Sequence, residues 1–413
     1  MNSPSSRFPT IRQSGAWLRM ACVGIAGLVA CLRMAGAAPL EDEFRDPPNA
    51  AKPGAYWYFM DGNIDQKELI RDLDSMKEAG LGHVIWLEVN VGVPRGPVTM
   101  LSEEWMKCFE AGVKYAAKLG IDVTLGTGPG WTGSGGPWIK PEESMQHLVF
   151  SEHEVQGPGR IEQKLTVAPQ RDHWWKMLDC DFYEDVAVYA VPTVKPVMTN
   201  ASEKAFYKRT DYMHDGPTFL PAPAVYDKVL PQDVIAPEGI IDLTKFLKPD
   251  GTLVWDAPAG KWTVLRFGRR SNGSSNLPAA KPMVGLDHDK FSKQALEKHF
   301  DHYCAKLIDR AGPVGAEGKG GLVALHLDSW EMNAQNWSPT LLEEFKRRRG
   351  YDFTPWLPTF SGRVVRDRAS SERALWDLRL TIQELMLENY VGHFRDLAKK
   401  RGLKFSIEPY GGT

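Results

Sequence analysis

The sequence predicts an α/β protein of the (β/α)8 barrel class, with part of the barrel inside these 413 residues. Short apolar runs alternate with segments of helical periodicity, and short connections with right-handed crossovers make the predicted sheet parallel. Polar and aromatic side chains follow the predicted strands, at the edge where barrels of this class carry their active sites. We count about six strand–helix units, whereas a closed barrel needs eight.

The charge balance is nearly even, with 50 Lys and Arg against 52 Asp and Glu. The net charge of −2 gives no electrostatic reason to expect nucleic acid or an acidic membrane surface as a partner. The 14 Trp and 12 Tyr are abundant, and many stand beside Gly, Asn or Asp. Flat indole faces with polar neighbours suit sugar rings, although we expect about half of the tryptophans to be core residues.

Residues 1–37 are predicted to be a signal peptide, because arginines precede a short apolar stretch and the small-residue sequence at 35–37. Leu28 to Cys31 also resembles a lipoprotein box, which would attach lipid at Cys31. The protein is therefore expected to be exported, and to be periplasmic, secreted or lipid-anchored on the outer membrane. The cysteines after this leader are widely spaced and predict neither a disulfide scaffold nor a zinc site.

Residues 38–148 are predicted to form the first part of the barrel. An aromatic strand over 55–60 leads to a helix capped by Asp65 and ended by Gly80, and a second strand covers 81–89. Ser102 is expected to cap the next helix, Gly120 to end it, and residues 121–125 to form a third strand. The glycine-rich loop 126–136 lacks the spacing of a phosphate-binding loop, so no nucleotide or redox cofactor is expected.

Residues 149–261 are predicted to be an inserted, mostly β module. Helical periodicity vanishes there, prolines are dense, and the aromatic and aliphatic content is too high for a solvated linker. Residues 262–413 are expected to return to the barrel, which continues past the end of this sequence. Their predicted elements are a fourth strand at 262–268, a helix at 292–310, a fifth strand at 322–327, a helix at 338–349 started by Ser338 and Pro339, a helix at 370–401 and a sixth strand at 404–407.

The candidate site follows the last two of these strands. Asp328, Glu331 and Asn336 follow the fifth strand, and Glu408 ends the sixth. Glycoside hydrolysis needs one protonated carboxyl and one ionised carboxylate, and neighbouring strands would place such groups around one cleft. The alternatives are an ordinary turn in which Asp328 caps backbone groups and a rim salt bridge at Glu408.

Four motifs in order resemble glycoside hydrolase family 106, the inverting α-L-rhamnosidases. They are the aromatic strand closing on DGN, GPGWTGSGGPW, HLDSWEMNAQNWSP and SIEPYGG, and the resemblance covers residues 56–413. It implies a (β/α)8 domain followed by β-sandwich domains. It also implies hydrolysis of terminal α-L-rhamnosyl residues of plant or microbial polysaccharides or glycosides.

The resemblance also implies roles for particular residues. The general acid falls on Glu331, and the general base is expected after Thr413. Glu408 becomes a substrate or calcium contact, because the family is similar in using a bound Ca²⁺, and Asp328 and Glu88 are the other eligible oxygen ligands. The residues expected to line the sugar pocket are Trp57, Asn63, Trp131, Trp138 and Asn336, with Asp328 and Glu88 beside them.

Two other functions stay open. A non-catalytic carbohydrate-binding protein or an inactive truncated homologue would keep the aromatic side chains without turnover. A barrel glycosidase of different sugar specificity also fits, because fold and carboxylates do not select the sugar. We expect the 413 residues alone to be inactive and to have exposed apolar barrel edges.

Overall fold

The computed structural model describes residues 40–169, 178–198, 229–332 and 334–408. The predicted signal peptide at 1–37, with Cys31, lies outside them. Of the described residues, 40–52 form a unit of their own, which contains helix α2 (Leu40–Arg45), and those from Pro53 onward form a second unit. Every helix in the described part is too short or too polar to span a membrane.

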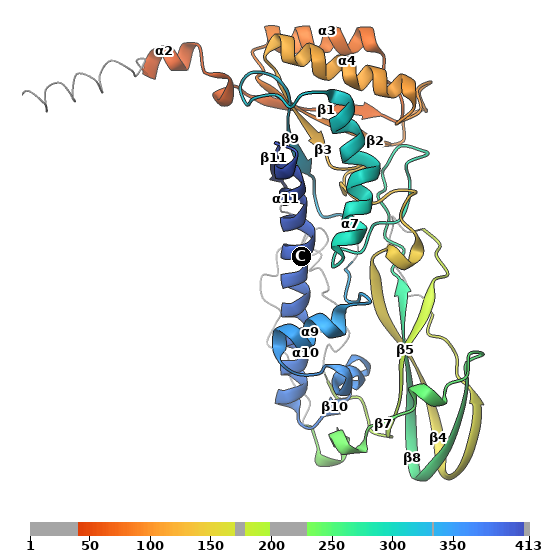
Figure 1. The fold of residues 1–413 in the computed structure, drawn as a ribbon. Helices are drawn as coiled ribbons and strands as arrows, with labels where there is room; N and C mark the ends of the chain where they lie inside the picture. Colours follow the sequence, from red (N-terminus) through yellow and green to blue (C-terminus); the bar gives the residue numbers. More distant parts are fainter. Residues whose placement is uncertain (1–39, 170–177, 199–228, 333, 409–413) are drawn as a thin grey trace, which may run out of the picture. The chain divides into compact units, whose positions relative to one another are not determined.

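The second unit contains a five-stranded parallel sheet whose strands stand in chain order. The strands are β1 (Gly54–Met60), β2 (His83–Val89), β3 (Asp122–Gly126), β9 (Gly321–Leu327) and β11 (Lys404–Ile407). Each pairs with its neighbour in parallel register, as the β-α-β rhythm predicts. The α/β class is therefore confirmed. The described strands form an open sheet, so closure into a barrel stays a prediction (Figure 1).

The first two helices begin and end where the sequence places their caps. Helix α3 (Gln66–Glu78) starts after Asp65, whose carboxylate accepts hydrogen bonds from two backbone N–H groups. Helix α4 (Glu103–Leu119) starts after Ser102 and ends at Gly120. The φ of 71° at Gly120 lies in the left-handed region, which glycine favours because it has no Cβ. Figure 1 shows the two helices side by side along the parallel sheet.

Strand alternation divides β1 between two faces of the sheet. Trp57 and Phe59 are buried and pack with Trp86 in the core under the helices. Tyr56 and Tyr58 point to the other face and stack with ring centroids 5.4 Å apart. Successive side chains of a strand point to opposite faces of the sheet. A shift of one residue along β1 would therefore move the core side chains to the face that carries Tyr56 and Tyr58.

An antiparallel sheet is inserted between β3 and β9. Its order is β4 (Gln146–Lys164), β8 (Thr252–Ser271), β5 (Tyr183–Pro192) and β7 (Ile241–Asp242), and β4 and β8 run side by side as long strands (Figure 1). The predicted fourth barrel strand at 262–268 is wrong, because these residues belong to β8 and pair antiparallel with β4 and β5. The predicted boundary at 261 therefore falls inside a strand. The run WTVLRFG is apolar enough to form a strand in either sheet. Its pairing with β4 and β5, which lie far away in the sequence, determines that it belongs to the inserted sheet.

The crossovers to β9 and β11 are helices interrupted by π-helical turns. Helices α7 (Lys293–Phe300) and α8 (Lys306–Ala311) flank a π turn at Asp301–Ala305. The predicted helix at 370–401 consists of α10 (Arg368–Leu385), a π segment at Met386–Val391 and α11 (Gly392–Lys400). These turns keep the helical course of the chain while shifting the side chains that follow them.

A second core joins the inserted sheet to the helices after β9. Leu148 of β4 and Phe267 of β8 pack with Phe345 of α9 (Leu341–Arg349) and Leu378 of α10. Part of 262–413 therefore packs on the insertion and not on the parallel sheet, contrary to the prediction. Helix α9 also starts later than predicted, after Thr340, and the Ser338 hydroxyl donates to Asp289.

The remaining elements are short. Strand β6 (Val234–Ile235) pairs in parallel with β10 (Val364–Val365). The 3-10 turns are η1 (Asn49–Ala51), η2 (Pro141–Glu143), η3 (Pro231–Asp233), η4 (Pro237–Gly239), η5 (Thr244–Phe246) and η7 (Thr354–Ser361).

Candidate active site at the ends of β9 and β11

The ends of β9 and β11 bring two predicted site residues together. Leu327 of β9 pairs with Ile407 of β11, so Asp328 and Glu408 leave the sheet side by side. The backbone N–H of Glu408 donates to the Leu327 carbonyl at 2.9 Å. His326 joins them, and one ligand atom from each of these three side chains lies within 4.8 Å of the other two.

This proximity changes the electrostatics of Asp328. Burial, a hydrogen bond with Glu408 and the charges of Glu408 and Glu331 together raise the pKa of Asp328 to about 7, although the hydrogen bond from the Ser329 N–H opposes this rise. Burial also lowers the pKa of His326, so the imidazole is neutral near pH 7. The cluster can therefore hold a proton or a cation between carboxyl groups at neutral pH.

Glu331 extends the same cluster. Its Oε1 accepts a hydrogen bond of 2.9 Å from the Ser329 hydroxyl, and the Ser329 N–H donates to Asp328 Oδ1 at 2.9 Å. Ser329 thus links the two carboxyl groups. Asp328 and Ser329 are buried, whereas Glu331 is half-buried. A half-buried carboxyl group beside a buried one can meet a substrate and exchange a proton with it.

Tyr56 contributes to the cluster from β1, and the sequence prediction missed it. Its hydroxyl donates to Glu408 Oε2 at 3.3 Å, and its ring centroid lies 6.2 Å from that of His326. Burial, with Asp328 and Glu408 nearby, raises the pKa of Tyr56, so the phenol stays protonated and donates. Trp57, which was predicted instead, donates from its indole to Asp72 of α3 at 3.1 Å. The alternation of Tyr56 and Tyr58 with apolar aromatics could have indicated this.

Two other predicted site residues lie elsewhere. Glu88 pairs in register with Phe59, so it faces the helix side of the sheet, opposite Tyr56. Its carboxylate accepts hydrogen bonds from the Trp105 indole of α4 and the Gly62 N–H, and burial raises its pKa to about 7. Asn63 is exposed, and its amide donates to the carbonyls of Met60 and Pro94, which shapes the loop after β1.

The remaining predicted residues have placements of their own. The Trp138 indole donates to His299 at 3.3 Å and stacks on His302 of the π turn after α7. The Asn336 side chain is buried and accepts a hydrogen bond from the Leu148 N–H of β4 at 2.9 Å. Trp131 is half-buried in the loop after β3, and its contact with a sugar stays a prediction.

A buried polar cluster in the loop after β8 was also missed. Lys290 is fully buried, and its Nζ donates to Ser134 at 2.6 Å and to Asp287 at 3.1 Å. The same Nζ lies 4.8 Å from the Tyr390 ring centroid. The sequence shows this cluster only as the run DHDK, which is equally typical of a solvated loop.

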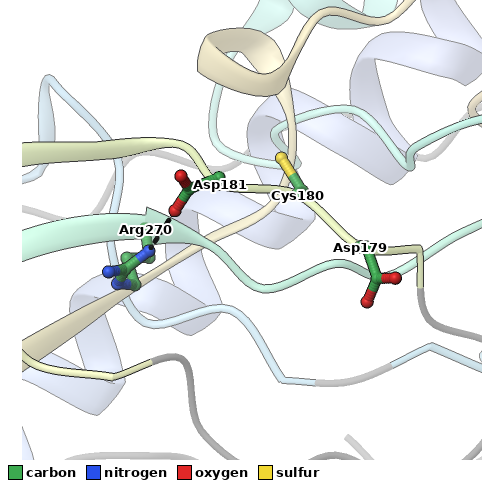
Figure 2. A pocket seen from close by; sticks show the side chains of 4 residues that line it. All are labelled: Asp179, Cys180, Asp181 and Arg270. Atoms are coloured by element: carbon green, nitrogen blue, oxygen red, sulfur yellow. Dashed lines mark ion pairs between the residues drawn. The ribbon is translucent and has the colours of Figure 1, made fainter.

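A surface pocket lies in the inserted sheet and not at this cluster. Asp179, Cys180, Asp181 and Arg270 line it, as Figure 2 shows. Arg270 Nη1 lies 3.6 Å from Asp181 Oδ1, and the Asp181 side chain is fully exposed. None of the predicted site residues lines this pocket, so it provides no support for a catalytic role.

Comparisons with known proteins identify relatives over most of the described region. A family model described as alpha-L-rhamnosidase matches residues 45–413. A protein of Formosa agariphila that bears the provisional name of a beta-glucuronidase is 37% identical over 375 residues, which is 90% of this chain and 31% of that protein. The solved structure of a rhamnosidase from Novosphingobium sp. PP1Y matches with a TM-score of 0.70 and 25% identity, over 90% of this chain and 47% of that one. The chain thus spans less than half of either relative.

Proposed function

Because this chain belongs to the α-L-rhamnosidase family of glycoside hydrolases, we propose that the complete protein removes terminal α-L-rhamnosyl residues from polysaccharides or glycosides by an inverting acid/base mechanism. One observation carries the proposal: the carboxyl groups of Asp328, Glu331 and Glu408 converge at the ends of neighbouring parallel strands. Active sites of α/β barrels occupy this edge of the sheet, and glycosidases need such carboxyl groups.

In this mechanism Glu331 is the general acid. Its carboxyl proton passes to the glycosidic oxygen as the bond to the anomeric carbon breaks, and a water molecule attacks that carbon from the opposite face. A second carboxylate accepts the proton of the water. The Ser329 hydroxyl supports this role, because its hydrogen bond to Oε1 restricts the rotation of the Glu331 carboxyl group.

Calcium is the cofactor that we propose for the site. Asp328 and Glu408 supply the carboxylate oxygens that Ca²⁺ prefers. Burial is the main cause of the raised pKa of Asp328, and a cation between the two groups would relieve the repulsion from Glu408 that adds to it. His326 offers nitrogen, which suits Ca²⁺ poorly, so it stays outside the proposed ligand set. Bound Ca²⁺ would hold vicinal sugar hydroxyls. Glu88 is not proposed as a ligand, because it faces α4.

Residues 1–37 support export, because arginines precede a short apolar stretch and a small-residue cleavage sequence. We propose a periplasmic, secreted or lipid-anchored protein, with attachment at Cys31 in the last case. N-terminal sequencing of the mature protein and lipid labelling would distinguish these three destinations. An uncleaved cytoplasmic product would contradict all of them.

The test is hydrolysis of aryl α-L-rhamnosides by the complete protein and by Glu331→Gln. Loss of a general acid typically costs about 10²- to 10⁴-fold in rate. We expect such a loss of kcat/KM with a poor leaving group and a much smaller one with a dinitrophenol leaving group, which departs without protonation. NMR of the first sugar released should show inverted configuration. Full activity of Glu331→Gln on the poor leaving group would refute the assignment.

A second candidate is hydrolysis of a uronic acid glycoside, which the provisional name of the Formosa relative favours. In the described residues, the charged side chains that act on the pKa values of Asp328 and His326 are carboxyl groups, and without the proposed Ca²⁺ they would repel a uronate carboxylate. Parallel assays on aryl α-L-rhamnoside and aryl β-D-glucuronide decide between the two. Binding of either sugar without turnover would instead identify a non-catalytic carbohydrate-binding protein.

A further inference from the structure

A buried carboxylate in the loop after β8 holds the segment that carries Glu331. We propose that Asp289 is a positioning residue for this segment, named here the acid loop, which comprises the described residues 328–332 and 334–338. The proposal rests on the proposed function, because it assigns a supporting role to the same acid. Asp289 is only 2% exposed. It accepts hydrogen bonds from Gln335 and Ser338 of the acid loop, which lie more than 40 residues further along the chain.

Both oxygens of the Asp289 carboxylate bond to the acid loop. Oδ1 accepts a hydrogen bond from the Gln335 amide, and Oδ2 accepts one of 2.6 Å from the Ser338 hydroxyl. Oδ1 also accepts from the Phe291 N–H at 2.9 Å, which fixes the carboxylate to its own turn. A carboxylate that accepts from donors at both oxygens has a defined orientation, and so have the donors.

The neighbouring backbone completes the attachment. The Lys290 N–H donates to Gln335 Oε1 at 3.0 Å, and the Gln335 amide also donates to the Trp337 carbonyl at 3.0 Å. The Asn272 amide donates to the Ala334 carbonyl at 3.1 Å. Both ends of the Gln335 side chain are therefore bonded, and the backbone on the C-terminal side of Glu331 is held at several points.

The same turn also reaches the N-terminal side of Glu331. The Lys290 ammonium lies over the Tyr390 ring, and the Trp330 ring packs edge-on against Tyr390 with centroids 6.3 Å apart. Trp330 directly precedes Glu331. Residues 289 and 290 thus contact, directly or through Tyr390, the chain on both sides of the acid.

This arrangement has a physical consequence for catalysis. A displacement of a catalytic group by about 1 Å can cost about 100-fold in rate. Although the charge of Lys290 opposes it, burial raises the pKa of Asp289 above its usual range, so ionising this carboxyl group inside the protein costs free energy. Its bonds to Gln335 and Ser338 offset part of that expense and set the position of the acid loop.

The experiment compares leaving groups in the complete protein with Asp289→Asn, which keeps the shape but turns one acceptor into a donor. We expect kcat/KM for a methoxyphenyl α-L-rhamnoside to fall about 10- to 100-fold. For the dinitrophenyl glycoside, which needs no acid, the fall should stay below about threefold. Glu331→Gln should show the same selective pattern with a larger amplitude.

Asp122→Asn is the matched control. The Asp122 carboxylate is also buried and accepts from the N–H groups of Gly318 and Gly320 at 2.7 and 2.9 Å, but it lies at the N-terminal end of β3. Any loss there should be equal for both substrates. Equal losses in Asp289→Asn would overturn the proposal and leave the proposed function intact.

A second pair of variants covers the case in which Asp289→Asn does not fold. Ser338→Ala removes one bond to Asp289, and Ser371→Ala removes a buried hydroxyl in α10 that bonds to Val365. A selective loss in Ser338→Ala alone supports the proposal, and equal losses on both substrates overturn it. A wild-type protein that turns over no aryl α-L-rhamnoside overturns the proposed function and this inference together.

Discussion

At the scale of single residues, the face of the sheet decides what a carboxyl group can do. Glu88 and Glu408 both stand near the C-terminal end of a parallel strand. Glu408 meets Asp328 and Tyr56, whereas Glu88 is buried against the Trp105 indole on the helix side. The first can meet a substrate or a cation, and the second can only affect stability.

Glu88 should make stability depend on pH. Burial raises its folded-state pKa from 4.5 to about 7, so between these values the folded protein holds a proton that the unfolded chain has released. The free energy of unfolding should therefore fall as pH rises from about 4.5 to 7, by on the order of 3 kcal/mol at most. Thermal melts of the complete protein and of Glu88→Gln should show a steeper decline of Tm with pH in the wild type.

Glu68→Gln is the control for this prediction, because Glu68 is exposed on α3, where it pairs with Arg71. Its Tm should follow the wild-type profile at every pH. Parallel profiles of wild type and Glu88→Gln would show that Glu88 is already ionised at neutral pH in the folded protein.

At the scale of elements, an ion pair between the buried Arg266 and the partly exposed Asp185 joins β8 and β5 of the inserted sheet. Arg266 is 5% exposed, and its Nε and Nη2 lie 2.7 and 2.8 Å from the two oxygens of Asp185. Its Nη1 donates to the Leu165 carbonyl at 2.8 Å. The guanidinium is thus bonded in three directions inside the sheet, and removal of Asp185 would leave a buried charge without its partner.

Asp185→Asn should therefore destabilise the inserted sheet by about 2 kcal/mol, less than for a fully buried pair because Asp185 is partly exposed. Hydrogen exchange followed by mass spectrometry should show faster exchange in peptides from β5 and β8. Glu184→Gln is the matched control, since Glu184 pairs with Arg269 but is 57% exposed, and it should cost less than about 0.5 kcal/mol. Equal exchange in the two variants would contradict this account.

At the scale of the whole molecule, bound calcium should stabilise the complete protein. A ligand that binds only the folded state at 100 times its Kd adds about 2.7 kcal/mol. We expect chelation to lower Tm and activity, and added Ca²⁺ to restore both. Glu408→Gln should lose this response, whereas Glu88→Gln should keep it. A calcium response that survives in Glu408→Gln would contradict the proposed ligands.

Most of the regular elements could be predicted, because their determinants are local. Asp65, Ser102 and Gly120 cap helices through neighbours within four residues. Apolar runs indicated β1, β2, β3, β9 and β11 for the same reason. The prediction failed at residues 262–268, where a strand was correct but its sheet was wrong. The partners of a strand lie far along the chain, and periodicity does not reveal them.

The candidate site divides in the same way. Asp328, Glu331 and Glu408 could be predicted because the sequence alone shows which carboxyl groups follow a predicted strand. Tyr56, His326 and Asp289 were missed, because each acquires its role from a partner on another element. The sequence predicts Trp57 in the place that Tyr56 occupies, because a one-residue difference along a strand changes the face of the sheet and not the aromatic composition.

By itself the sequence determined the α/β rhythm, the family resemblance and the strand ends that carry the carboxyl groups. Only the tertiary structure decided which of these groups meet, which sheet receives 262–268, and how Asp289 joins the acid loop to the loop after β8. The physical reason is the range of the interactions. Helix caps and hydrophobic periodicity are set by residues within a few positions of each other. Strand pairing, the groups that a side chain meets and the shifted pKa of Asp328 depend on contacts between distant segments.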